Sequence, residues 1–480
     1  MAMKRTVILK IGSGIIKLGV FSAILAFLFL EAQQILKLNM GHRGTDNVNG
    51  FYAEKENSIE VLFIGASTMF CTADPLVLYE DYGIASYDFG SSAQPFELSY
   101  LFMQEALKTQ KPKVIALEML GIKDELDTSK ADNLNYGLTD MPFSKEKAAG
   151  VYDMFRNDKG AGLSYLIPMV QYKDRWQELT KEDFETNYVN YAKGAYTPDL
   201  VSENPLDFSS YYEEEPFEIP QRNREIFDRM VTLCEENGIE LLLFKSPNVG
   251  WNIGQTKAVA ALAEEYRLPF IDYYSLMEEL EIDTAQDFRD NTHFNRYGSK
   301  KASDYLGKYL TEHYELMDWR VTDSNNSWDL ALLDRAHDRA NEALSKTAAL
   351  PDYMSLIPYE GHTIVFCATG DISGMEDFLR GVSAAFGLEE EKLRSGASFA
   401  VKDGQLVSPL VGPGDQSWQW EQGYDTVKLT GYSITYNREV QQLVDNGLTI
   451  LVYDNDWRQL VDIVGFDAAD PAHGVRGDES

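Results

Sequence analysis

Short apolar runs alternate with longer amphipathic segments between about residue 57 and residue 318. The apolar runs are rich in Ile, Val, Leu and Phe and cover residues 59–64, 84–89, 113–119, 239–245 and 268–272. Helical spacing occurs between them, at residues 95–110, 222–237, 255–266 and 296–310. Strands that are apolar throughout and alternate with helices are typical of a parallel sheet covered on both faces. We therefore predict an α/β domain over residues 58–318.

Residues 123–215 interrupt this alternation. The stretch is long, polar and rich in Tyr, Asp and Glu, with a helical pattern over residues 163–179. A connection of this length in a compact domain is usually a lid, a binding insertion or a partly disordered segment. The sequence leaves these three alternatives open.

The sequence pattern changes after the α/β domain. An alanine-rich amphipathic segment, residues 328–350, ends at Pro351 and indicates a helical connector over residues 319–352. Residues 353–470 then carry frequent turn signals and β-type patterns, which predict a β-rich α+β domain. Its expected strands are residues 363–368, 398–402, 426–437, 448–454 and 459–466, with one helix at 375–386. We expect residues 471–480 to form a frayed tail.

The N-terminus reads as a membrane anchor, residues 1–36. Basic residues come first, and an uncharged run follows from Leu18 to Leu30. Counted from Gly12, the segment approaches the roughly 20 residues that a spanning helix needs, with Lys17 reaching toward the headgroups. A cleaved signal peptide is the alternative, but no small-residue cleavage site follows. The positive-inside rule places the N-terminus in the cytoplasm and the rest outside, after a polar stalk at residues 37–57.

The hydrophobic content, net charge and cysteine count of the chain exclude some classes of function. The chain of 480 residues is 44% hydrophobic and 12% aromatic, which is typical of globular domains. Its formal net charge of -33 argues against a nucleic-acid partner. The 3 cysteines are widely separated and form neither a disulfide framework nor a metal-binding spacing. The sequence predicts no metal and no cofactor, and an exported chain this poor in cysteine suggests a bacterial cell-surface protein.

Two distant segments carry candidate chemistry. Ser67 follows the first apolar run on a turn of small residues, and Asp290 precedes His293 by three positions ahead of the last helix. A hydroxyl nucleophile needs a base, and the base needs a carboxylate that holds its tautomer. Within residues 1–320 the other histidines are His42, in the stalk, and His313, after the last helix. His293 is therefore the base that a serine enzyme built on this domain would use.

Each of these residues also has a structural explanation. Ser67 would cap a helix after a strand-to-helix turn, and Asp290 or Asn295 would cap the last helix. Taken singly, these explanations are the stronger ones. The combination of the three residue types is what favours chemistry.

These residues resemble the SGNH/GDSL hydrolase superfamily. The likeness covers about residues 57–315 and rests on Gly65-x-Ser67, on Gly90 after the second strand and on Asp290-x-x-His293. It implies a flavodoxin-like three-layer α/β/α sandwich. It also implies Ser67 as nucleophile, His293 as base, Asp290 as orienting carboxylate, and an oxyanion hole from the N–H groups of Ser67 and Gly90. The anchor is similar to those of the lipoteichoic-acid D-alanylation and alginate-type O-acetylation proteins.

One departure concerns the third oxyanion donor. The superfamily usually supplies an Asn after the third strand, whereas this chain reads Ala-Leu-Glu-Met-Leu-Gly over residues 116–121. Loss of one such donor typically costs about 10²–10³ in turnover. Gln94, Asn248 and Lys245 are candidate substitutes, and the sequence does not choose among them.

Residues 359–468 resemble the interleukin-like EMT inducer domain. The likeness rests on residues 446–454 and 460–467 and on the strand-helix segment 368–388. It implies a compact β-rich fold that binds carbohydrate in some relatives. Trp418 and Trp420 are the aromatic candidates for such a role, and a place in the core is as plausible.

Together these features predict a membrane-anchored, extracytoplasmic O-acyltransferase or esterase that acts on a cell-surface polysaccharide, with acetyl as the expected group. The expected partners are a cell-surface glycan or cell-wall polymer, a membrane-bound O-acyltransferase, and the lipid bilayer through residues 12–30. The rival hypothesis is a non-catalytic surface scaffold or glycan-binding protein with a degenerate SGNH domain.

Overall fold

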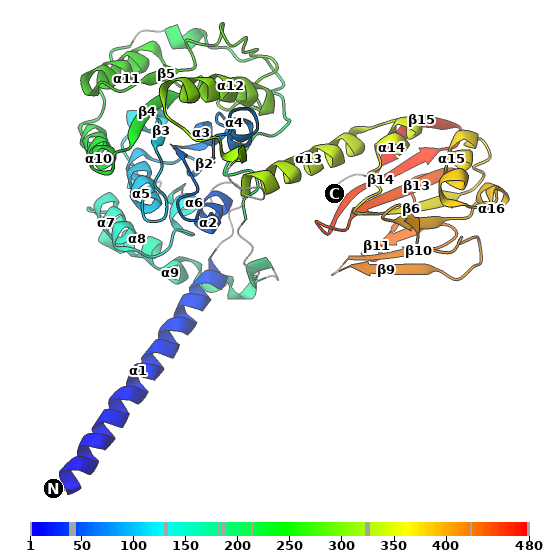
Figure 1. The fold of residues 1–480 in the computed structure, drawn as a ribbon, viewed down its shortest axis with the longest axis horizontal. Helices are drawn as coiled ribbons and strands as arrows, with labels where there is room; N and C mark the ends of the chain where they lie inside the picture. The colour runs from blue at the N-terminus through cyan, green and yellow to red at the C-terminus, as the bar shows by residue number, and fades with distance from the viewer. Residues whose placement is uncertain are drawn as a thin grey trace. The chain divides into compact units, whose positions relative to one another are not determined.

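The computed structural model describes residues 2–37, 45–128, 133–179, 182–184, 189–212, 215–321, 327–422 and 425–477. The chain divides into two compact units, Met1–Leu332 and Leu333–Ser480. Helix α13 (Ser327–Lys346) carries the chain from one unit to the next (Figure 1).

A five-stranded parallel sheet forms the centre of the first unit. Its strands are β1 (Val61–Ile64), β2 (Ser86–Asp88), β3 (Val114–Glu118), β4 (Glu240–Lys245) and β5 (Phe270–Asp272). The spatial order is β2-β1-β3-β4-β5, and every neighbouring pair is parallel. This order is the one seen in flavodoxin-like doubly wound sheets. The predicted parallel α/β architecture is confirmed, although each strand is shorter than the apolar run that predicted it.

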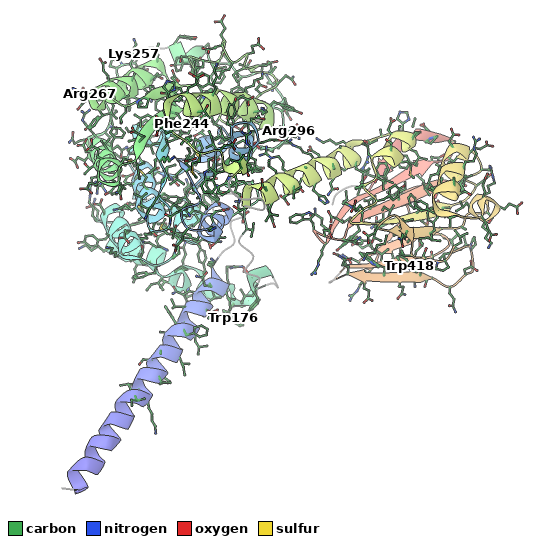
Figure 2. All side chains as sticks on the ribbon, in the orientation of Figure 1. Trp176, Phe244, Lys257, Arg267, Arg296 and Trp418 are labelled. Carbon is green, nitrogen blue, oxygen red and sulfur yellow. The ribbon has the colours of Figure 1, made fainter. Side chains whose placement is uncertain are left out.

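Helices cover both faces of this sheet (Figure 1). Helix α5 (Phe96–Ala106) packs with α10 (Gln221–Asn237), and α4 (Pro75–Tyr82) packs with α12 (Arg296–His313). Helix α11 (Ile253–Tyr266) lies beside β5. Side chains of the strands are consequently enclosed from both sides; Phe244, labelled in Figure 2, is fully buried. Helix α4 and the single turn α3 (Ser67–Phe70) are elements that the periodicity did not predict.

Part of the predicted stalk is folded. Residues Thr45–Ala53 form helix α2, and its Val48 and Phe51 are buried in the core of the first unit. The ring of Phe51 stacks on Phe89 at 3.9 Å between centroids. The polar and glycine-containing composition concealed this helix, because Val48 and Phe51 are its only fully buried apolar side chains. Residues 38–44 of the predicted stalk, including His42, lie outside the described residues.

The insertion is built mainly from short helices. They are α6 (Asn135–Leu138), α7 (Lys145–Met154), α8 (Lys159–Leu166) and α9 (Pro168–Tyr172), followed by 3₁₀ turns at Lys173–Gln177, Glu182–Phe184 and Ser209–Tyr212. Helix α7 packs on α5, where Gly150 approaches Leu101. Helix α7 therefore packs on the sheet domain, whereas α9 and the turns Lys173–Gln177 and Glu182–Phe184 contact helix α1.

The N-terminal helix α1 spans Ala2–Leu36. Its segment Ile16–Leu36 is long and apolar enough to cross a membrane, and none of its most apolar window is buried. Its C-terminal end contacts α9 and the Lys173–Gln177 turn of the insertion. An apolar helix of this length is what an anchor requires.

The second unit is β-rich. A six-stranded sheet has the order β15-β14-β13-β6-β7-β8, and a four-stranded sheet has the order β12-β11-β10-β9. The first sheet contains β6 (His362–Thr369), β7 (Phe399–Lys402), β8 (Gln405–Leu406), β13 (Gly447–Asp454), β14 (Gln459–Asp467) and β15 (Asp470–Arg476). The second contains β9 (Trp418–Gln422), β10 (Asp425–Leu429), β11 (Ile434–Tyr436) and β12 (Glu439–Gln441). The helices are α14 (Leu350–Leu356), α15 (Glu376–Phe386) and α16 (Glu390–Arg394). The β-rich character predicted for this region is confirmed.

Three local predictions for this unit were wrong. Residues 426–437 form the hairpin β10–β11 and not one strand, because the chain turns around Gly431. Pro351 does not end a helix; it stands in the first turn of α14, where its missing N–H costs nothing. Most of the predicted tail is strand β15, which pairs antiparallel with β14. Its polar, mostly exposed side chains gave no apolar signal, since it is an edge strand.

Candidate active site

Ser67 stands at the carboxyl end of the central strand β1. The strand ends at Ile64, Gly65 and Ala66 make the turn, and Ser67 begins α3. Parallel α/β sheets bind ligands outside the carboxyl ends of their strands, so the position suits a functional side chain. The helix that starts here is a single turn, and Ser67 does not cap it: the N-cap position is Ala66.

The structure brings Ser67, His293 and Asp290 together. Ser67 Oγ lies 2.8 Å from His293 Nε2, and His293 Nδ1 lies 2.9 Å from each carboxylate oxygen of Asp290. A carboxylate only accepts hydrogen bonds, so His293 Nδ1 carries the proton and donates it to Asp290. The lone pair of Nε2 then faces the Ser67 hydroxyl. The arrangement can remove the serine proton and hold it during an acyl transfer.

A tight loop holds Asp290 and His293 in place. A β-bridge joins Phe288 to Phe294, and the N–H of Arg289 donates to the carbonyl of His293 at 3.1 Å. Asn295 is the N-cap of α12 and accepts from the N–H of Tyr297 at 2.9 Å. The capping role therefore belongs to Asn295, and Asp290 is left to orient the imidazole.

Hydrogen bonds keep Asp290 ionised. Its partial burial acts to raise the pKa, but bonds from His293 and from the N–H and hydroxyl of Thr292 outweigh this and hold the pKa well below its ordinary value. Arg289 adds an ion pair, with Nε 3.3 Å from Asp290 Oδ2. The orienting carboxylate is thus charged throughout the physiological pH range.

Gly90 lies directly against the turn that carries Ser67. A Cβ added at Gly90 would stand 2.3 Å from the carbonyl oxygen of Gly65 and 2.6 Å from Met69 Cε. No side chain fits in this space, so the close approach requires glycine. The contact places the second-strand loop beside the Ser67 turn.

A cavity of about 330 Å³, lined by both polar and apolar side chains, opens beside this turn. Ala66, Gln94 and Asn248 are among its lining residues, as are Lys123 and Asp124. Gln94 is engaged in a buried network, accepting from Ser91 Oγ and donating to Ser99 Oγ, both at 3.0 Å. Asn248 Oδ1 accepts a 2.7 Å bond from the N–H of Gly250, and its Nδ2 donates to no partner within the described part of the chain.

Lys245, the remaining candidate for the third oxyanion donor, makes other contacts. Its side chain is fully buried, and Nζ lies 3.2 Å from Asp272 Oδ1. The ammonium also faces the rings of Tyr211, Trp251 and Tyr274 at 5.2–5.4 Å. These contacts give it a structural role at the end of β4.

Glu118 is a residue of this site that sequence reasoning passed over. It ends β3, in place of the segment where an oxyanion Asn was expected, and it is almost completely buried. Its Cβ is 2.6 Å from the position that a Gly65 Cβ would take. Burial raises the pKa of Glu118 to about 8, with Lys245 acting in the opposite direction. A buried carboxyl behind the Ser67 turn was detectable as an acidic residue closing an otherwise apolar strand.

Trp418 and Trp420 belong to the second unit and pack on one of its hydrophobic clusters. Trp418 lies on β9, as labelled in Figure 2. The Trp420 ring meets Tyr453 edge to face at 4.9 Å between centroids. Both indoles are therefore partly buried against this cluster.

No protein-family model matches the chain, and no curated protein matches it. Among solved structures, it is similar to a protein from Desulfitobacterium hafniense DCB-2 assigned to the G-D-S-L family of lipolytic proteins. The identity is 13%, the TM-score is 0.29, and the match covers 53% of this chain and 100% of the other. A protein from Bacteroides fragilis NCTC 9343 assigned as an acylhydrolase matches at 14% identity with a TM-score of 0.26, over 54% of this chain and 90% of the other. Likenesses this low carry no argument about fold or activity.

Proposed function

We propose that the first unit is an SGNH-type serine esterase or O-acyltransferase, with Ser67 as nucleophile, His293 as base and Asp290 as orienting carboxylate. The observation that supports this most directly is the continuous chain of contacts from Ser67 Oγ through the His293 ring to Asp290, each 2.8–2.9 Å long. If Ser67 had only a structural role, a hydrogen bond to His293 would be enough, and Asp290 would not be needed to hold the other ring nitrogen.

The proposed reaction has two acyl transfers. His293 Nε2 takes the Ser67 proton while Oγ bonds to the ester carbonyl carbon, and the protonated imidazole then gives that proton to the leaving alcohol. In the second step a sugar hydroxyl or water loses its proton to His293 and attacks the acyl-serine. Release of Ser67 with the returned proton completes the cycle.

The oxyanion that forms in each step needs donors. We propose the backbone N–H groups of Ser67 and Gly90, with Asn248 Nδ2 as the third donor. Asn248 fits this role better than the other candidates because it lines the cavity beside Ala66 and its amide hydrogens bond to no other described residue. Gln94 is already committed to Ser91 and Ser99.

Asn248→Ala tests this assignment. We expect ester turnover to fall by about 10²–10³, the usual effect of removing one oxyanion donor, with little change in KM. The measurement is steady-state hydrolysis of an aryl acetate by the full chain in detergent. Ser275→Ala, on the exposed surface of the same unit, is the control; an unchanged rate in Asn248→Ala would assign the third donor elsewhere.

The acceptor class and the location are part of the proposal. The cavity beside Ala66 carries the polar side chains of Lys123, Asp124 and Asn248, which would bind a sugar through hydrogen bonds. The apolar helix Ile16–Leu36 would hold the enzyme at the membrane, facing the cell surface. We propose acetyl groups on a cell-surface polysaccharide or cell-wall polymer as the substrate class, with a membrane-bound O-acyltransferase as donor partner.

Ser67→Ala tests the central chemistry. The variant is expected to lose at least about 10³-fold in aryl acetate hydrolysis and in acetyl transfer to an oligosaccharide acceptor. Both products are followed by mass spectrometry, which separates hydrolysis from transfer. Equal activity in Ser67→Ala and wild type would favour the alternative of a non-catalytic scaffold.

A further inference from the structure

Three metal-ligand atoms meet in the second unit, away from Ser67 in the sequence and outside the proposed reaction. They are His337 Nδ1, His362 Nε2 and Asp454 Oδ2, and all lie within 4.8 Å of one another. Asp454 Oδ2 is 3.1 Å from His337 Nδ1 and 3.7 Å from His362 Nε2. All three atoms are buried, and none of them makes a hydrogen bond within the described part of the chain.

The fold of this unit positions the three side chains independently. Strands β6 and β13 pair antiparallel, and their register sets His362 directly opposite Asp454. Helix α13 supplies His337, whose ring centroid lies 5.4 Å from that of His362. The side chains of His362 and Asp454 are 1% and 0% exposed, whereas that of His337 is 26% exposed. The cluster is therefore enclosed on the sheet side and open to solvent through the helix.

Neighbouring hydrogen bonds fix which atoms face inward. His362 Nδ1 donates to the carbonyl of Glu360 at 2.8 Å, so in the neutral ring Nε2 presents a lone pair to the carboxylate. Asp454 Oδ1 accepts from the N–H groups of Asp456 and Trp457, both at 2.9 Å. Its Oδ2 is thus the oxygen that remains for the histidines. The lone pair of His362 Nε2 and the negative charge of Asp454 Oδ2 repel each other when no hydrogen lies between them. A cation bound between these two atoms would replace the repulsion with attraction to both.

We propose that His337, His362 and Asp454 bind a divalent transition-metal ion, with Zn²⁺ as the best match. Two imidazoles and one carboxylate are a zinc-type donor set. Bonds of about 2.0–2.2 Å in a tetrahedron separate ligand atoms by about 3.3–3.6 Å, close to the two distances to Asp454 Oδ2. The bond from His362 Nδ1 to a carbonyl is the outer contact that metal-bound histidines usually make.

The surrounding charge also favours a cation. Asp338 follows His337 on α13 and interacts electrostatically with both His337 and Asp454. The ion would join helix α13 to the paired strands β6 and β13, three segments that are distant in sequence. The ion would cross-link these segments, and a tetrahedral ion held by three ligands would keep its fourth position open at the exposed His337 side.

Metal titration of the full chain in detergent, stripped with EDTA and dialysed, tests the site. Co²⁺ is added first, because its visible absorption reports tetrahedral nitrogen and oxygen ligands, and Zn²⁺ is then titrated as a competitor. We expect one Co²⁺ per chain at this site, displaced by one Zn²⁺. Mutating a residue that only contacts a metal ligand typically weakens metal binding by about 10–100-fold. His337→Ala and Asp454→Asn each remove a proposed ligand, so each should weaken Co²⁺ binding by more than this.

Two variants serve as matched controls. His473→Ala removes an exposed histidine that also pairs with an aspartate, Asp470, at 3.0 Å, and His293→Ala removes the histidine of the candidate active site. Both should bind Co²⁺ like wild type. Asp454→Asn keeps an oxygen for the N–H groups of Asp456 and Trp457, and its circular dichroism spectrum shows whether it is folded. The proposal is overturned if wild type gives no tetrahedral spectrum, or if the spectrum survives in His337→Ala, or if it is lost in His293→Ala.

Discussion

Asp290 determines which nitrogen of His293 carries the proton. Its carboxylate accepts from Nδ1, and this leaves Nε2 as the base facing Ser67. The sequence could indicate these residues because histidine is scarce in the first 320 positions, and because the aspartate and histidine lie three residues apart. The sequence could not show that Asn295 caps α12, which is what frees Asp290 from that role.

Asp290→Asn is therefore expected to lower ester turnover by about 10³–10⁴ while the protein stays folded. The amide would donate to Nδ1 and so place the proton on Nε2, where it cannot accept from Ser67. Steady-state hydrolysis of an aryl acetate measures the loss, with Asp283→Asn, on the preceding loop, as a comparison. A variant that retains more than a tenth of the wild-type rate would show that Asp290 does not set the tautomer.

Glu118 shows how a single buried residue links the site to stability. Its folded-state pKa of about 8 lies above the ordinary value of about 4.3, because burial disfavours the charged form. Between these two values the folded chain holds a proton that the unfolded chain has released. Stability therefore falls as pH rises from about 4.3 to about 8 and is independent of this group outside that window.

Glu118→Gln should remove this dependence, because glutamine stays neutral. We expect the variant to gain stability over wild type as pH rises through the window, by up to roughly 4 kcal/mol. Thermal unfolding at pH 5 and pH 8.5, compared between the two chains, measures the difference. A constant difference at both pH values would mean that Glu118 ionises in the folded state as it does in the unfolded state.

At the level of helices and strands, apolar content decided what could be predicted. The strands of the parallel sheet are buried on both faces, so each one lies in a continuous apolar run that predicted a strand. Strand β15 is polar and mostly exposed, and only its pairing with β14 makes it a strand. The hairpin β10–β11 read as one strand because the turn at Gly431 falls within a continuous β-type pattern.

Arg476 is expected to hold β15 in place. Its guanidinium lies 2.9 Å from Asp462 Oδ2 and donates to the carbonyls of Leu344 and Thr347. Arg476→Ala leaves the buried Asp462 without its cation, which we expect to cost about 3 kcal/mol. Hydrogen exchange along β15 and thermal unfolding of the full chain measure the effect. His473→Ala, exposed on the same strand, should leave both nearly unchanged, and equal behaviour of the two variants would contradict the account.

On the scale of the whole molecule, sites depend on contacts between residues that are far apart in the chain. Ser67 and His293 meet because the ends of β1 and the segment before α12 lie at the same edge of the sheet. A sequence alone could suggest that pairing only through the residue types and their chemistry. It could not suggest the meeting of His337, His362 and Asp454, since their positions show no metal-ligand spacing and depend on the register of β6 and β13.

The apolar helix α1 and the two units give the proposed function its physical setting. An apolar helix of this length would confine the chain to a membrane surface, and the strongly acidic composition would keep the remainder soluble. An enzyme held in this way would meet polymers near the membrane at high local concentration.

The central claim is that Ser67 is activated by His293, and covalent labelling tests it most directly. The full chain in detergent is treated with a fluorophosphonate, and intact mass is read for wild type, Ser67→Ala, His293→Ala and the control Ser275→Ala. We predict one adduct on wild type and on Ser275→Ala, and none on Ser67→Ala or His293→Ala. An absence of labelling on folded wild type, or labelling that persists in Ser67→Ala, would contradict the account.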